Sequence, residues 1–169
     1  AVSVGLNRSA GTRLSVLMPY CDRFADLGLW FCQLWAESIG KQGEGTTPIG
    51  AIGTVDQHSQ LQLYLDGPAD KMFSLILTET SGQGTSVPAA FSDIEGLSYL
   101  SGHTMGDLLA VAGRSTAETL ANNGRPTRVL HVPVVDEFSM GALMMHFMVE
   151  TMITADLLGV NAFDQPAVE

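Results

Sequence analysis

Apolar and polar positions follow two spacings along the chain, and each spacing indicates a different element. Short apolar runs bounded by turn residues predict strands buried between other elements. Apolar residues that return every three or four positions predict helices with one buried face. The strand-like runs are 13–18, 48–52, 72–78 and 127–135, and the helix-like stretches are 22–37, 56–65, 104–122 and 139–158.

The order of these stretches predicts the fold class. Each strand is followed by a helix that can carry the chain back across the sheet, which favours parallel strands covered on both faces. We therefore expect an α/β fold, a three-layer α/β/α sandwich around a mostly parallel sheet of the flavodoxin-like, doubly wound type. No repeat, coiled coil or linker divides residues 1–169, so a single domain is expected. Residues 1–12 are assigned to no element.

Local signals indicate where some elements begin and end. Asp22 and Asp56 are expected to be helix N-caps, because a carboxylate there accepts the free N–H groups of the first turn. Gly40 predicts the end of the helix over 22–37. The Gly/Ser-rich segment 80–86 offers backbone N–H groups to a phosphate, but no clear helix follows it directly, so a solvated loop is favoured.

Composition and charge exclude some classes of partner. Apolar residues make up 46% of the chain and charged residues 15%, which suits a surface that partners cover. The net charge of −10 argues against binding nucleic acid or an anionic membrane. His146, Glu150 and Asp156 interrupt the long apolar stretch 140–160, which predicts a buried helix and not a membrane span.

Cysteine and histidine usage indicates no metal site or other cofactor. Cys21 and Cys32 form neither a zinc pattern nor a disulfide framework, and no basic segment precedes an apolar one at the N-terminus. A cytoplasmic protein with two free thiols is therefore expected. His131 lies in an apolar strand and is expected in the core, and His103 in the loop before a helix. The methionines near His146 are expected to pack in the core; they are Met140, Met144, Met145, Met148 and Met152.

Glu37 is a candidate general base. It stands near the end of an apolar helix, four residues after Gln33, so the carboxylate and the amide share one helix face. The alternative interpretation is a surface glutamate that caps the turn or pairs with Lys41.

His58 is a candidate proton-exchanging group. It lies in the first turn of the short helix that starts near Asp56, where an imidazole can face a bound ligand. The alternative interpretation is a polar residue bonded to Gln57 or Gln62.

Three phrases carry a resemblance to a known family. They are Glu-Ser-Ile-Gly-Lys at 37–41, Gly-Thr-Val-Asp-Gln-His at 53–58 and Phe-Asp-Gln-Pro-Ala-Val-Glu at 163–169. In wording and order they resemble the glucose-6-phosphate isomerases, and the segments 18–20 and 56–64 resemble the bacterial branch in particular.

The resemblance implies a sugar isomerase (SIS) domain that interconverts glucose 6-phosphate and fructose 6-phosphate without a metal. The sugar ring opens, and a proton then moves between C1 and C2 through a cis-enediol. Glu37 would be the base that carries this proton, and His58 would assist ring opening from the neighbouring subunit of a homodimer. Gln33 and Gln165 match family positions that contact the substrate.

The chain also departs from the family pattern. Ala167 stands where the family more commonly has glycine. The family's ring-opening lysine follows three residues after the position of Glu169, and its Gly-Gly-Arg motif and phosphate loop belong to a preceding domain. We therefore expect part of a longer enzyme that is inactive alone. A non-catalytic sugar-phosphate-binding or dimerisation module is the alternative, and an isomerase that also accepts mannose 6-phosphate is a third possibility.

Overall fold

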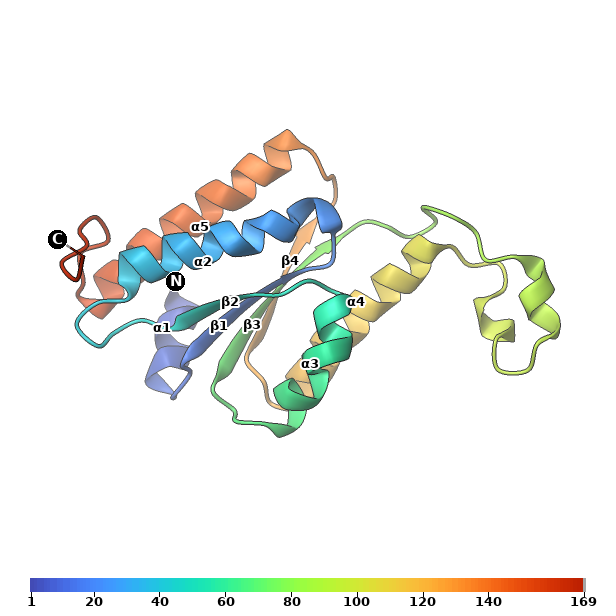
Figure 1. The fold of residues 1–169 in the computed structure, drawn as a ribbon, viewed down its shortest axis with the longest axis horizontal. Helices are drawn as coiled ribbons and strands as arrows, with labels where there is room; N and C mark the ends of the chain where they lie inside the picture. Colours follow the sequence, from blue (N-terminus) through green and yellow to red (C-terminus); the bar gives the residue numbers. More distant parts are fainter. Residues whose placement is uncertain (169) are drawn as a thin grey trace.

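A computed structural model describes residues 1–168, and four parallel strands form its sheet in the order β2-β1-β3-β4 (Figure 1). The parallel pairing is direct: Leu14 of β1 lies opposite Thr47 of β2 and Lys71 of β3, and Phe73 of β3 lies opposite Thr127 of β4. The strands are β1 (Leu14–Pro19), β2 (Thr47–Gly50), β3 (Lys71–Thr78) and β4 (Thr127–Val132).

Helices cover both faces of this sheet, which confirms the three-layer α/β/α fold (Figure 1). On one face lie α1 (Val2–Ser9), α2 (Ala25–Ile39) and α5 (Glu137–Leu158), and on the other lie α3 (Val55–Asp66) and α4 (Met105–Asn122). Three short 3-10 helices complete the described elements: η1 (Asp22–Phe24), η2 (Ala89–Asp93) and η3 (Ser98–Leu100). The helix α1 was not predicted.

Alternate residues of the central strands feed two hydrophobic cores. Successive strand side chains point to opposite faces, so Leu17 packs under α2 and α5 while Val16 packs under α3 and α4. Six consecutive residues of β3 are buried, which confirms the prediction of a strand covered on both sides. The largest side chains of the two cores are Trp35, Phe31 and Phe147 on the first face and Tyr64, Tyr20 and Phe73 on the second.

Gly113 lets α4 lie close against the sheet. A Cβ at this position would stand 2.7 Å from Leu77 Cδ2 and 3.2 Å from Tyr20 Cγ. The first of these contacts is shorter than real Cβ atoms make, so a larger residue would force the Leu77 side chain to shift, whereas glycine lets the helix approach without that shift.

Both predicted N-caps are wrong, whereas Gly40 does end α2. Asp22 opens the 3-10 helix η1, and α2 begins after Phe24 without a side-chain cap. Asp56 is already inside α3, where its carboxylate accepts the N–H of Ile52 at 2.7 Å and the amide of Gln60 at 3.0 Å. The carboxylate of Asp56 thus binds the N–H of the turn before α3 instead of capping the helix.

The last strand and helix differ from their predicted bounds. β4 ends at Val132 instead of 135, because Pro133 has no N–H to continue the ladder. α5 then starts two residues earlier than expected, since Asp136 caps it by accepting the N–H of Ser139 at 2.8 Å.

The predicted core position of His131 is wrong. Within residues 1–168 β4 pairs only with β3, so it is an edge strand of the described sheet, and the side chains of His131 and Val129 are exposed. An apolar strand sequence does not distinguish a central strand from a partly covered edge.

α5 is apolar on all sides but only partly buried. Leu143 and Phe147 pack in the core, while Met145 and Met152 are exposed, so the prediction that the methionine stripe is all core is wrong for these two. By length and composition α5 could cross a membrane. In this fold it packs along α2 and buries the carboxylate of Glu150.

Candidate functional site

Glu37 lies at the end of α2, at the edge of the sheet where the strands begin. The helix α2 follows β1 and runs antiparallel to it, which brings its last turn back to the amino ends of the strands (Figure 1). Gln33 stands one turn earlier, and its amide Nε2 donates to Glu37 Oε1 at 3.2 Å. Both side chains are exposed, so a ligand can reach them.

Gln165 reaches the same carboxylate from the other end of the chain. Its amide Nε2 donates to Glu37 Oε2 at 3.2 Å, across 128 positions of sequence. The segment that carries it turns back after α5 at Gly159, whose left-handed conformation suits glycine. Glu37 and Gln165 together line a cleft of about 250 Å³, whose other lining residues are Ala36, Gly40, Lys41, Pro166, Ala167 and Val168.

Lys41 ties this returning segment to the end of α2. Its buried Nζ lies 3.0 Å from Asp164 Oδ1 and also donates to the carbonyl oxygen of Asn161. The hydrogen bond from Lys41 lowers the pKa of Asp164, which keeps this carboxylate charged. The alternative interpretation, in which Lys41 pairs with Glu37, is therefore wrong: Lys41 holds the neighbour of Gln165.

The arrangement leaves Glu37 able to accept a proton. A carboxylate offers about four lone-pair positions, and the two amides occupy one on each oxygen. Amide donors also fix the orientation of the carboxylate without neutralising it. A carboxylate held in this way beside an open cleft suits a general base.

His58 lies far from this cleft within one chain. It is in the first turn of α3, which follows the carboxyl end of β2 and covers the opposite face of the sheet (Figure 1). Gln57 accepts a hydrogen bond from Tyr20 at 2.7 Å, and Gln62 donates to Asp66 at 3.3 Å. Neither glutamine bonds the imidazole, so the alternative interpretation of His58 is wrong.

The segment 80–86 is held by a hydrogen bond to the first turn of α4. Asp107 in the first turn of α4 accepts the N–H of Gly82 at 2.8 Å, and it forms a reciprocal capping box with Thr104. The N–H of Gly82 is therefore bonded to a protein carboxylate, and the segment forms a loop, as predicted. The Thr-x-x-Asp spacing is the signal from which this cap was predictable.

Sequence reasoning did not single out the Lys41–Asp164 pair, although both residues lie inside the family-like phrases. Within residues 1–168, no three His, Cys, Asp or Glu side chains gather as metal ligands. Cys21 and Cys32 are both free.

Comparisons with known proteins identify relatives of this chain. No protein-family model matches it. A curated glucose-6-phosphate isomerase of Rubrobacter xylanophilus is 44% identical over 164 residues, which are 97% of this chain and 38% of that protein. A probable glucose-6-phosphate isomerase of Methanococcus maripaludis is 37% identical over all of this chain and 37% of its own length. The chain thus spans a little over a third of the curated relatives it matches.

Solved structures show the same fold. A hypothetical protein from Thermus thermophilus superposes with a TM-score of 0.86 at 38% identity, over 99% of this chain and 41% of that one. A glucose-6-phosphate isomerase from Chlamydia trachomatis has the same fold, with a TM-score of 0.72 at 21% identity over 94% of this chain and 33% of its own. Nearly the whole chain is therefore homologous to one segment of proteins named as glucose-6-phosphate isomerases.

Proposed function

We propose that this chain is the part of a glucose-6-phosphate isomerase that carries the proton-transferring base, and that the base is Glu37. The observation that carries the proposal is the pair of amides, from Gln33 and Gln165, that orient the Glu37 carboxylate beside an open cleft. The relatives named as this enzyme make glucose 6-phosphate and fructose 6-phosphate the substrates that we propose.

In the proposed mechanism Glu37 moves one proton along one face of the open-chain sugar. A carboxylate within about 3 Å of C2 removes the proton beside the carbonyl and returns it to C1, while the proton of the O2 hydroxyl passes to O1, so that the aldehyde at C1 becomes a ketone at C2. Gln33 and Gln165 have two further roles: they hold the carboxylate in place, and their second N–H groups can donate to the oxygens of the enediol. This step needs no metal, because hydrogen-bond donors stabilise the developing charge.

We further propose that the active site is completed by other parts of the protein. His58 lies on the opposite face of the sheet from Glu37, which supports a role in the site of a neighbouring subunit and hence a homodimer. The exposed apolar side chains of α5, among them Met145 and Met152, fit a surface that the assembled protein covers.

Residues 1–169 would then form one domain of a longer cytoplasmic enzyme. The phosphate-binding loop and the ring-opening lysine expected for the family would come from the rest of that enzyme. The relatives are long enough to contain them, since this chain covers 38% of the Rubrobacter protein. We therefore propose that the isolated chain does not turn over substrate.

The test is Glu37→Gln in the full-length protein. The amide keeps the shape but cannot accept the proton, so kcat should fall about 10³-fold while the sugar phosphate still binds. Exchange of the C2 proton with deuterium from solvent, followed by NMR, should stop as well. Glu44→Gln is the matched control, because Glu44 is an exposed glutamate close by that pairs with Arg8.

The same measurement separates the proposal from its alternative. A non-catalytic sugar-phosphate module would bind substrate in the wild-type protein without any C2 exchange. Near-normal isomerisation by the Glu37→Gln protein would refute the role of Glu37.

A further inference from the structure

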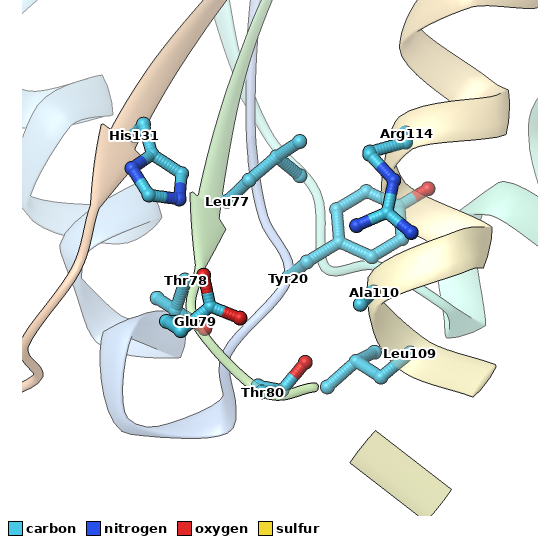
Figure 2. A pocket seen from close by; sticks show the side chains of 9 residues that line it. All are labelled: Tyr20, Leu77, Thr78, Glu79, Thr80, Leu109, Ala110, Arg114 and His131. Carbon is cyan, nitrogen blue, oxygen red and sulfur yellow. The ribbon is translucent and has the colours of Figure 1, made fainter. Parts of the chain in front are cut away.

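A second cavity lies at the opposite edge of the sheet from Glu37. Its floor and walls come from the carboxyl ends of β1, β3 and β4 and from the first turns of α4 (Figure 2). It encloses about 70 Å³, which suits a compact ligand and not a nucleotide. The proposed function makes no use of this cavity.

The topology of the sheet favours a ligand at this place. From β1 the chain passes to β2 on one side, while β3 lies on the other side, and the connecting helices α2 and α3 cover opposite faces. Ligands of open parallel sheets bind outside the carboxyl ends of the strands, where the order reverses in this way. The cavity lies between Tyr20, which follows β1, and Thr78, which ends β3.

Arg114 points a free guanidinium at this cavity (Figure 2). The chain has eight lysines and arginines. Within residues 1–168, six of them bond a carboxylate or a backbone carbonyl, whereas the exposed side chains of Arg13 and Arg114 have no such partner. The six are Arg8, Arg23, Lys41, Lys71, Arg125 and Arg128. Of these two arginines, Arg114 is the one that lines this cavity.

The other walls supply a second polar end and an apolar side. Glu79 follows β3 and lies between Arg114 and His131 without forming an ion pair to either in the described structure (Figure 2). The ring of Tyr20 is fixed, because its hydroxyl donates to Gln57 at 2.7 Å. Leu77 adds an apolar surface.

We propose that this cavity is a second ligand site, for a small anion that also carries hydroxyl groups, such as a short sugar phosphate or a hydroxy acid. Arg114 holds the acid group through its planar fork of N–H donors. Glu79 accepts hydrogen bonds from the hydroxyls, and His131 bonds the remaining oxygens. A ligand that bridges Arg114 and Glu79 satisfies both charges, which an inorganic anion cannot do.

Equilibrium dialysis of the full-length protein with three probes tests the site: glycerol 3-phosphate, glycerate and inorganic phosphate. Arg114→Gln should weaken binding of the hydroxylated probes about tenfold or more. Arg23→Gln is the control, because it removes the same charge from an arginine whose guanidinium donates to the carbonyl of Val135. Binding at the Glu37 cleft is common to all variants and cancels in this comparison.

Glu79→Gln tests the second polar end of the site, and it should change phosphate binding in the opposite direction to Arg114→Gln. Loss of the negative charge should tighten binding of inorganic phosphate and remove the advantage of glycerol 3-phosphate over it. Preference for glycerol 3-phosphate over glycerate, or the reverse, tells which acid group the site takes, and either result supports a built site.

Two results would overturn the proposal: equal binding by wild type and Arg114→Gln, or no binding of any probe at about 10 mM. Circular dichroism checks that the variants fold, as expected for exposed positions. Because no step here measures isomerisation, failure of the Glu37 test would leave this inference intact.

Discussion

At the scale of single residues, Lys41 decides where Gln165 lies. Its side chain is only 7% exposed, and its ammonium group pairs with Asp164 and donates a hydrogen bond to the carbonyl oxygen of Asn161. Asn161 in turn donates from Nδ2 to Asp164 Oδ2 at 3.1 Å, which closes a small polar network around the returning segment. The network fixes the backbone directly before Gln165. It therefore also positions the Gln165 amide that donates a hydrogen bond to Glu37.

Replacing Lys41 tests this positioning role. Lys41→Met keeps the apolar stem but releases Asp164, and a shift of about 1 Å at Gln165 should lower kcat about 100-fold with a smaller change in KM. Steady-state kinetics of the full-length protein measure both constants. Lys71→Met is the matched control, since Lys71 is equally buried but pairs with Asp70 at the start of β3. Equal losses in the two variants would mean that a buried lysine matters only for folding.

Glu150 is the other charged residue with a large structural role. It is 4% exposed on α5, and the guanidinium of Arg128 on β4 binds both its oxygens, with Nη2 and Oε2 2.7 Å apart. Burial alone would raise the pKa of Glu150, but the hydrogen bonds and positive charge of Arg128 outweigh it, and the pKa is lowered to about 2. Arg128 also donates to Ser74 Oγ at 2.7 Å, so the pair joins α5, β4 and β3.

The direction of this pKa shift predicts how stability depends on pH. The ordinary pKa of 4.5 is lowered to about 2 on folding, so the pair stabilises the fold fully above about pH 4.5 and progressively less as the pH falls toward 2. Glu150→Gln should cost about 3 kcal/mol in the free energy of unfolding at pH 7. Urea unfolding across this pH range measures the difference, which should shrink on acidification.

Asp156→Asn, an exposed change on the same helix, is the control and should shift stability by less than about 0.5 kcal/mol. A difference between wild type and Glu150→Gln that stays constant from pH 7 to pH 3 would contradict the assignment.

At the scale of elements, the start of α4 depends on its capping box. Thr104 Oγ1 accepts the N–H of Asp107 at 3.1 Å, and Asp107 Oδ2 accepts the N–H of Thr104 at 2.8 Å. Because Asp107 also holds Gly82, the cap joins the helix to the loop that follows β3.

Thr104→Ala should destabilise the protein by about 1 kcal/mol and speed amide hydrogen exchange at Gly82. Thr119→Ala, in the last turn of the same helix, is the control and should change neither quantity by much. Unchanged exchange at Gly82 in Thr104→Ala would mean that the loop is held independently of the cap.

Most elements were predictable because their signals are local. Four strands and four long helices follow from apolar spacing alone, and the strand–helix alternation was enough for the fold class. The wrong or missing predictions concern positions where a tertiary contact determines the local structure. Asp56 bonds the turn before its helix, His131 is exposed because β4 pairs with one strand in the described structure, and α1 is a short helix that depends on tertiary contacts such as its packing against α5.

The candidate site was predictable only in part. The spacing of Gln33 and Glu37 on one helix face is visible in the sequence, and their hydrogen bond follows it. The approach of Gln165 over 128 positions has no local signal, and only the family resemblance pointed to it. Arg114, Glu79 and His131 come from three different elements, so no spacing could have grouped them.

At the scale of the whole molecule, the separation of Glu37 and His58 predicts complementation between subunits. Full-length Glu37→Gln and His58→Ala proteins should each be inactive. In a mixed dimer, one site would then combine both changes and the other would have neither. Unfolding and refolding an equal mixture should therefore restore about a quarter of wild-type activity, since half the dimers are mixed and each has one intact site.

This experiment needs no structure of the dimer. Activity that stays at the level of the separate variants would mean that Glu37 and His58 act from the same chain, or that the protein works as a monomer. A mixture of Glu37→Gln with Lys41→Met is the control. Both changes belong to the same cleft, so each site of a mixed dimer would contain one of them.

The all-parallel sheet also sets the order of events while the protein is being made. The strand β1, which starts at Leu14, cannot pair until β2, which starts at Thr47, and then β3, which starts at Lys71, have been synthesised. The reason is that within residues 1–168 no strand pairs with a neighbour through a tight turn. At about 5–20 residues per second, the apolar strand β1 leaves the ribosome several seconds before its second partner. During that interval its unpaired edges can pair with other nascent chains. The yield of folded protein in cells should therefore depend on chaperones and on translation speed.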